Sequence, residues 1–203
     1  MINKLSWLIM LIIVPLALGF GCGELGKVDQ GRVIEYDKEK QTVTLIRDLK
    51  ADPGKPDYNT LPPHTYSLPT DPMEMGPEPK AAYRMKLDTK KNQIVIFDPA
   101  TQNFVTIDYK LVDQKENLDP KDPLVYDKAA DKAKKFPVID RDKKTITVYS
   151  KRLKIMTTFT PPDEYFARSD KTWDAGDEVR IYYKEEGKAK RFMNLSKTDI
   201  FKK

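Results

Sequence analysis

The sequence has very little of the residues that carry most enzyme chemistry. Its 203 residues include one cysteine, Cys22, and one histidine, His64. With so little thiol and imidazole, nucleophilic catalysis of the Cys–His or Ser–His type has almost no material. The nine glycines form neither a Walker loop nor a GxGxxG motif, so phosphate-cradling loops are missing as well. The sequence therefore predicts a protein that is not an enzyme and that carries no cofactor.

Long apolar runs are equally scarce, and the one present lies at the N-terminus. It reads SWLIMLIIVPLALGF at residues 6–20, follows the positive Lys4 and contains Pro15. A bilayer-spanning helix needs about 20 apolar residues, which makes a transmembrane helix the weaker alternative. Residues 1–21 are therefore expected to be an export signal.

The lone cysteine follows this segment directly, with Gly21 before it and Gly23 after it. The segment resembles a bacterial lipoprotein signal, in which the cysteine is diacylated on its thiol and becomes the first mature residue. Gly21 fits that pattern, whereas Gly19 stands where a branched aliphatic residue is typical. A free thiol behind a plain secretory signal is the alternative. The resemblance implies a lipid anchor on Cys22, and the absence of aspartate after it favours the outer membrane, on its periplasmic face.

Charge of one sign is not concentrated anywhere. The 36 basic and 31 acidic residues give a net charge of +5, and segments such as DRDKK and KEEGKAKR mix both signs. Such mixing is typical of a solvated surface and argues against nucleic acid as a partner. The expected partners are the membrane, through Cys22, and an envelope protein or polymer.

A recurring pattern runs through the chain. It reads VIEYDKEKQTVTL at 33–45, RMKLDTKKNQIVI at 84–96 and PVIDRDKKTITV at 137–148. In each copy an aspartate opens a lysine-rich turn, and apolar residues follow it at six and eight positions. Period-two alternation around a polar turn predicts a β-hairpin with one buried face. The three sets are Asp37/Val43/Leu45, Asp88/Ile94/Ile96 and Asp140/Ile146/Val148. The aspartate is expected to bond the turn backbone, which requires no catalytic role.

Two further hairpins and one helix are expected. DPATQN at 98–103 and KEEGKA, in which Gly187 supplies positive φ, join alternating segments. DPLVYDKAADKAKKF at 122–136 reads as a helix with Asp122 as its N-cap and Pro137 beyond its end.

Together these patterns predict a mainly β protein. The expected fold is two tandem small antiparallel β-barrels of OB-like type, at 28–116 and 136–203, after a tether at 22–27. The linking helix lies within 117–135, and a proline-rich loop covers 50–80. A single sandwich of all the strands is the alternative.

The sequence offers one candidate metal site. His64, Met73 and Met75 fall close together in the sequence, and imidazole with thioether suits Cu(I). With the small-barrel pattern, the arrangement resembles the copper chaperones of periplasmic Cus efflux systems. Those place a tryptophan over the metal, whereas Trp173 lies far along this chain. The alternative is that His64 is a surface strand residue and both methionines pack the proline-rich loop.

Clustered carboxylates give the other enzymatic hypothesis. Asp174, Asp177 and Glu178 form one group, and Asp163 and Glu164 form another. Paired carboxylates serve a hydrolase when they face each other across a cleft. Their neighbourhood of turns and lysines favours solvated turn residues instead.

The whole mature pattern is similar to a family of uncharacterised lipoproteins of sulfate-reducing bacteria, a domain of unknown function. The segments that carry this resemblance are QIVIFDPATQNF, TWDAGDEVRIYYKEEGKA and NLSKTDIFKK. The resemblance implies an envelope location and transfers no functional residue. The sequence thus predicts a membrane-anchored envelope lipoprotein that acts as a non-enzymatic binding or structural module.

Overall fold

Most of the described chain forms β-strands, which confirms the prediction of a mainly β protein. The computed structural model describes residues 25–52 and 54–198. The expected signal peptide and Cys22 lie outside these ranges. Within them, no helix is long and apolar enough to cross a membrane.

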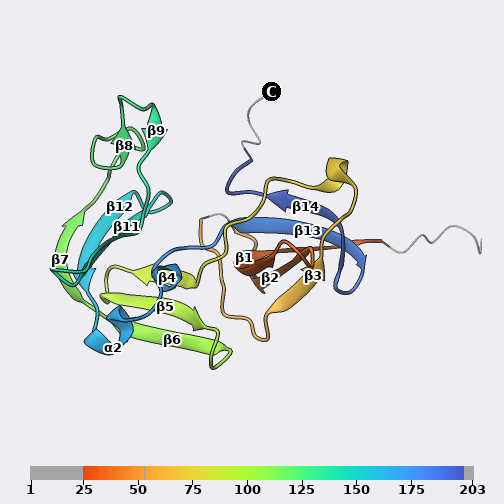
Figure 1. Cartoon of the computed structure of the whole chain (residues 1–203), viewed down its shortest axis with the longest axis horizontal. Helices are drawn as coiled ribbons and strands as arrows, with labels where there is room; N and C mark the ends of the chain where they lie inside the picture. The colour runs from red at the N-terminus through yellow and green to blue at the C-terminus, as the bar shows by residue number, and fades with distance from the viewer. Residues whose placement is uncertain (1–24, 53, 199–203) are drawn as a thin grey trace, which may run out of the picture.

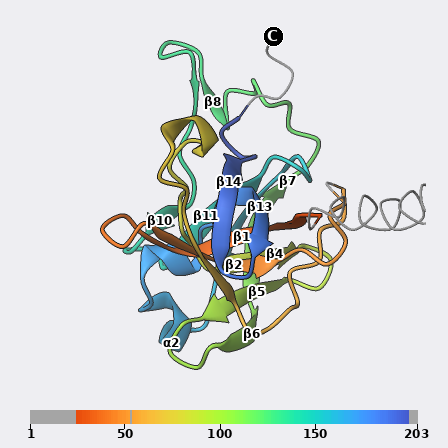
Figure 2. The ribbon, with the colours of Figure 1, turned by 90° about the vertical axis from the view of Figure 1, so that its right-hand side faces the viewer.

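Five strands close into one barrel, seen on the right of Figure 1. Their order around it is β1 (Lys27–Asp37), β13 (Glu178–Glu185), β14 (Lys188–Asn194), β3 (His64–Ser67) and β2 (Thr42–Arg47). All neighbours are antiparallel except β14 and β3. The β13–β14 hairpin faces the viewer in Figure 2. Strands from both ends of the described chain therefore build this barrel.

Alternate side chains of the barrel strands fill its interior. Val43 and Leu45 of β2 and Ile181 of β13 are each 0% exposed. They pack with Tyr66 of β3 and Phe192 of β14. The period-two pattern thus places one face of every strand in a closed apolar core.

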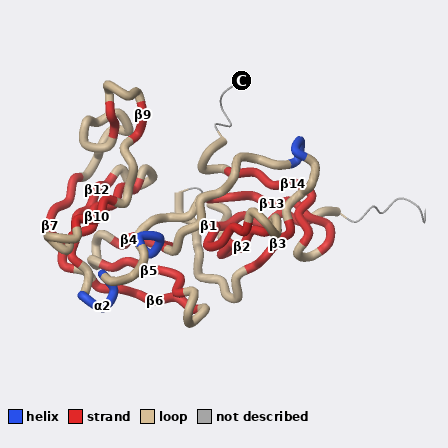
Figure 3. Tube along the Cα trace, viewed as in Figure 1, coloured by secondary structure: helices blue, strands red, loops and turns tan. Residues whose placement is uncertain are grey.

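The remaining strands form two open sheets and a small hairpin, shown as red tubes on the left of Figure 3. The four-stranded sheet has the order β10 (Val138–Asp140), β11 (Thr145–Ser150), β12 (Ile155–Thr160) and β7 (Lys110–Lys115). The three-stranded sheet contains β4 (Arg84–Asp88), β5 (Gln93–Asp98) and β6 (Asn103–Asp108).

A second apolar core lies between the two open sheets. It joins Ile94 and Ile107 of the three-stranded sheet to Ile146 and Phe159 of the four-stranded one, with Trp173 against Phe159. A third cluster, which includes Ile34, Ile46, Met85 and Phe97, connects the outside of the barrel to β4 and β5. The barrel and the two-sheet unit are therefore packed against each other.

The repeated hairpins are confirmed. Asp37, Asp88 and Asp140 each accept a hydrogen bond from the backbone N–H three residues later. The apolar residues at six and eight positions are all at most 1% exposed. The predicted turns at 98–103 and at Gly187, whose φ is +75°, are also present.

Only one of the two expected barrels is present in the described chain. Strands β10 to β12, from the predicted second barrel, enter the open four-stranded sheet with β7. The β13–β14 hairpin instead pairs with β1 over Lys27–Arg32. This pairing closes the first barrel.

The predicted linking helix is wrong. The segment 122–136 contains a short hairpin of β8 (Tyr126–Asp127) and β9 (Lys132–Ala133). The Asp127 carboxylate accepts hydrogen bonds from the N–H groups of Ala129 and Ala130, which is the same turn chemistry as in the longer hairpins. Helical structure is short in the described ranges: η1 (Pro72–Glu74), α2 (Asp163–Phe166) and η2 (Asp170–Thr172).

Candidate functional site

A small basic cavity lies where the barrel meets the two-sheet unit. Its volume is about 180 Å³. Arg32 of β1, Arg84 of β4 and Arg152 of the β11–β12 turn line it, together with Glu178 at the start of β13. We name this cavity the arginine cleft. Three guanidinium groups from distant parts of the chain thus meet at one junction.

Arg84 is the most deeply placed of the three. The residue is 9% exposed, and its Nε donates a hydrogen bond to the Trp173 carbonyl oxygen at 2.9 Å. Burial, together with the neighbouring Arg32 charge, lowers the pKa of Arg84 to about 10, so the group is still cationic at neutral pH. Its two Nη atoms make no hydrogen bond with any residue of the described ranges.

The neighbouring carboxylates do not neutralise Arg84. Asp174 raises the pKa of Arg84 only in part, and both Asp174 oxygens accept hydrogen bonds from Lys80 Nζ at 2.9 Å. Glu178 also lines the cleft, but its Oε1 accepts a hydrogen bond from Gln30 Nε2 at 2.7 Å. Neither acid forms an ion pair with an arginine of the cleft among the described residues.

Arg32 holds β1 against β4. Its Nη1 donates to the carbonyl oxygens of Arg84 and Met85 at 3.1 and 2.9 Å. Its guanidinium carbon lies 4.4 Å from the centre of the Tyr58 ring, a cation–π contact. The buried Arg32 Nε has no hydrogen-bond partner within the described chain. Burial also raises the pKa of the Tyr58 hydroxyl to about 12, so this ring stays neutral.

Arg152 opens the cleft toward solvent. It is exposed in the turn between β11 and β12. It also lines an adjoining cavity of about 360 Å³, whose wall includes Lys55 and Lys86. Because guanidinium groups that share a small cavity repel one another, an anion bound between them would relieve that repulsion. Arginine is also the side chain whose planar fork matches carboxylate and phosphate oxygens.

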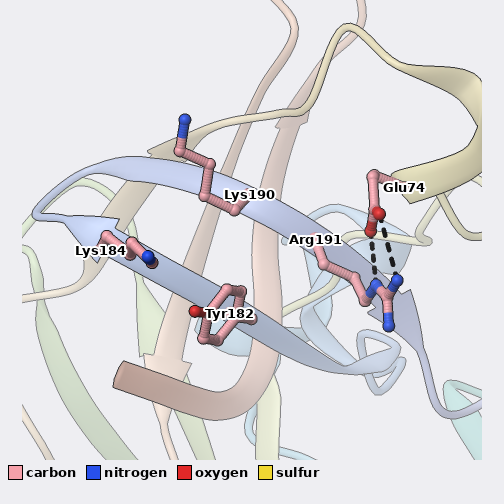
Figure 4. A pocket seen from close by; sticks show the side chains of 5 residues that line it. All are labelled: Glu74, Tyr182, Lys184, Lys190 and Arg191. Atoms are coloured by element: carbon pink, nitrogen blue, oxygen red, sulfur yellow. Dashed lines mark hydrogen bonds and ion pairs between the residues drawn. The ribbon is translucent and has the colours of Figure 1, made fainter. Parts of the chain in front are cut away.

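A second, wider pocket lies on the outer surface of the barrel. Glu74, Tyr182, Lys184, Lys190 and Arg191 line it, as Figure 4 shows. Arg191 is paired with Glu74, with one Nη2–Oε1 distance of 3.1 Å. The two lysines come from the adjacent strands β13 and β14; Lys184 lies near Tyr182, whereas the Lys190 side chain points away from the ring. This surface therefore carries two lysines and one aromatic ring.

The three residues of the copper hypothesis lie along different parts of the barrel wall. His64 of β3 is paired with Leu45 of β2. Its Nδ1 lies 3.8 Å from Oε1 of Glu186, which is in the β13–β14 turn. Met73 is 88% exposed in η1. Met75 forms a β-bridge with Phe192 of β14. Phe192 lies four residues beyond Lys188, and Lys188 pairs with Ser67 of β3. His64 therefore lies beside the β13–β14 turn, whereas Met75 lies beside Phe192, toward the other end of β14.

The copper hypothesis stays a prediction. The described residues contain no group of three or more His, Cys, Asp or Glu side chains placed to hold a metal ion. Cys22, the expected lipidation site, lies outside the described residues.

Most of the clustered carboxylates form hydrogen bonds or ion pairs with other parts of the chain. Asp177 is 7% exposed, accepts hydrogen bonds from Lys80 N and Asn194 Nδ2 at 2.8 and 2.9 Å, and lies near Lys197. The interpretation of Asp177 as a solvated turn residue is therefore wrong. Asp163 is exposed and pairs with Lys144 on a separate surface.

The sequence reasoning missed the arginine cleft. Arg32 and Arg84 each stand at the start of an alternating hairpin segment, and Arg152 stands in the basic turn SKRLK. None of these local patterns distinguishes an arginine in a cavity from one on the surface. The one local signal is that Arg84 stands between Tyr83 and Met85 in the sequence.

Comparison with known proteins gives a family and nothing more specific. No curated protein and no solved structure matches the chain. The family described as "Domain of unknown function (DUF4881)" matches residues 24–203, which is nearly all of the sequence. The chain therefore belongs to the DUF4881 family.

Proposed function

We propose that this protein is a lipid-anchored lipoprotein of the cell envelope that acts as a non-enzymatic binding module. In this proposal Cys22 carries the anchor, and the arginine cleft takes an anionic group of the ligand. The observation that carries the ligand site is Arg84, which is only 9% exposed, donates its Nε to the Trp173 carbonyl and makes no Nη hydrogen bond within the described residues, so that its Nη atoms are free to face the cavity. A bound phosphate or carboxylate would accept charge-assisted hydrogen bonds from these atoms.

The size of the cleft narrows the ligand class. Its volume of about 180 Å³ is smaller than the roughly 300–1,000 Å³ of pockets that hold a whole drug-sized ligand. It suits one phosphate or carboxylate group. The adjoining cavity of about 360 Å³ would take the portion of the ligand next to that group. Envelope polymers and the acidic side chains of envelope proteins both carry such groups.

A binding role is favoured over catalysis by how the acidic side chains are used. Asp174 is paired with Lys80, and Asp177 connects Lys80 to β14. A general acid or base needs a carboxyl group within reach of the substrate proton. The acid that does line the cleft, Glu178, is already hydrogen-bonded to Gln30.

Calorimetric titration of the full chain with inorganic phosphate at low ionic strength tests the ligand site. We expect binding to the unmodified protein and a loss of about tenfold in affinity for Arg152→Ala, because a hydrogen bond to a charged group contributes about 1.5–3 kcal/mol. Arg152 is exposed, so its removal should leave the fold intact. Arg141→Ala is the matched control, since Arg141 is also exposed and pairs with Asp170 at 2.8 Å. Equal affinities for the two variants would rule out the cleft as the site.

The anchor has a separate test. The mass of the mature N-terminal peptide, isolated from membranes, should show Cys22 as the first residue carrying acyl chains. Cys22→Ala should abolish that peptide and release the protein from the membrane fraction, because stable attachment requires more than one acyl chain. An unmodified thiol in the soluble fraction would contradict the lipoprotein proposal.

A further inference from the structure

We infer that the outer surface of the β13–β14 hairpin, beside the start of β1, docks on an anionic lipid surface. This inference rests on the proposed anchor at Cys22. We name this surface the tether face, and its residues are Leu25, Val28, Tyr182, Lys184 and Lys190. It is separate from the arginine cleft, which shares no lining residue with it.

The tether face adjoins the point where the chain enters the barrel. Strand β1 begins at Lys27, and Val28 is directly opposite Tyr182 in β13. Gly26 lies against the Tyr182 ring so closely that a Cβ atom there would be 2.1 Å from Cε2. Lys27 lies five residues after Cys22, and a chain covers at most about 3.6 Å per residue. An acylated Cys22 would therefore hold the start of β1 within roughly 18 Å of the anchored residue.

The chemistry of the tether face suits a headgroup layer. Leu25 and Val28 are 95% and 56% exposed, which is unusual for apolar side chains at one place on a folded surface. Tyrosine and lysine are the side chains that accompany apolar groups at membrane–water interfaces. Lys184 and Lys190 form no ion pair with a described carboxylate, whereas Arg191 is paired with Glu74.

Charge and position together favour a lipid surface over a soluble partner. Each basic residue close to an anionic leaflet adds an attraction that falls off within about one Debye length, or roughly 8–10 Å. Two lysines alone would bind such a surface only weakly. Next to an anchor they act at high effective concentration, so the same two charges become enough to orient the barrel.

Lysine footprinting on vesicles tests the inference. The full chain, purified from membranes, is inserted into vesicles of phosphatidylcholine alone or of phosphatidylcholine with phosphatidylglycerol. It is then treated with an amine-acylating reagent and mapped by mass spectrometry. We expect Lys184 and Lys190 to react roughly tenfold more slowly on the anionic vesicles and to regain their reactivity in high salt. Lys128 and Lys135, exposed near the β8–β9 hairpin, should react alike on both.

A charge-reversal pair keeps the test independent of folding. Lys184→Glu should remove most of the protection of Lys190 on anionic vesicles. Lys128→Glu makes the same change in net charge and should keep that protection. Equal reactivity of Lys184 and Lys190 on the two vesicles, with Cys22 acylated, would overturn this inference and leave the anchor standing. An unmodified Cys22 would overturn both.

Discussion

The β1–β2 and β10–β11 hairpins have the same turn geometry but belong to different architectures. In both, an aspartate accepts the N–H three residues later, and a residue with positive φ follows it at four positions, Gln41 and Lys144. The two hairpins also bury apolar residues at the same spacing. One belongs to a closed barrel and the other to an open sheet.

The length of the first strand explains this difference. β1 covers Lys27–Asp37, which is long enough to pair with β13 in its first half and with β2 in its second, with a register shift between Val33 and Glu35. β10 covers only Val138–Asp140 and follows Pro137, which has no N–H to donate. The β13–β14 hairpin therefore finds its pairing edge on β1, and β10 remains an edge strand. Turn chemistry fixes each hairpin, whereas strand length decides closure.

The largest effect is expected where β1 pairs on both sides. Gly31 is opposite both Arg47 and Val179, and a Cβ atom there would lie 2.3 Å from the Ile46 carbonyl oxygen. Gly31→Ala should lower the free energy of unfolding by about 4 kcal/mol or more, because backbone atoms must move to admit the methyl group.

Thermal unfolding followed by circular dichroism measures this loss. Gly54→Ala is the matched control, since the nearest atom to its added Cβ is a flexible side-chain oxygen at 3.3 Å. A Gly31→Ala midpoint within a few degrees of the control would break the argument that β1 holds the barrel closed.

A second prediction compares a barrel hairpin with the small β8–β9 hairpin. Leu45, eight positions after Asp37, is 0% exposed, whereas Lys135, eight positions after Asp127, is exposed. Leu45→Ala should cost about 3 kcal/mol of unfolding free energy through lost burial and the cavity left behind. Lys135→Ala should change it by less than about 0.5 kcal/mol. Denaturant unfolding of both variants checks this, and similar costs would mean that the β8–β9 hairpin packs more tightly than its exposure indicates.

The same comparison shows which parts of the fold the sequence could predict. The three repeated hairpins were predictable because an aspartate, a polar turn and two apolar residues all lie within one local segment. Asp127 opens the same turn, but the surrounding alanines and lysines have helical propensity, which led to the wrong helix. The choice of partner for β13 depends on the free length of β1, about 150 residues away in the sequence, and no local pattern carries that information.

The arginine cleft was unpredictable for a related reason. Arg32, Arg84 and Arg152 come from β1, β4 and the β11–β12 turn, and they meet only because the barrel packs on the two-sheet unit. Hydrophobic periodicity predicts which face of a strand is buried, but it does not predict where two units pack against each other. By contrast, the scarcity of catalytic residue types is a property of composition alone, and it remains the basis for expecting a binding protein.

The smallest effect tests whether the shared turn behaves identically in both settings. The backbone N–H of Lys40 holds the pKa of Asp37 below its ordinary value, and that of Lys143 does the same for Asp140. A carboxylate with a lowered folded-state pKa stabilises the fold above its unfolded value of about 3.9, and this contribution is lost as the pH falls through the lower folded value.

The stability gap between the unmodified protein and Asp140→Asn should therefore be constant above about pH 5 and shrink below about pH 4. Asp37→Asn should follow the same profile, because one turn geometry produces both shifts. Asp142→Asn is the matched control, because it makes the same change in net charge in the β10–β11 turn and removes no side-chain hydrogen bond to the described residues. Unfolding midpoints measured across this pH range decide the matter: different profiles for Asp37→Asn and Asp140→Asn would mean that sheet closure, and not the turn alone, sets the behaviour of these aspartates.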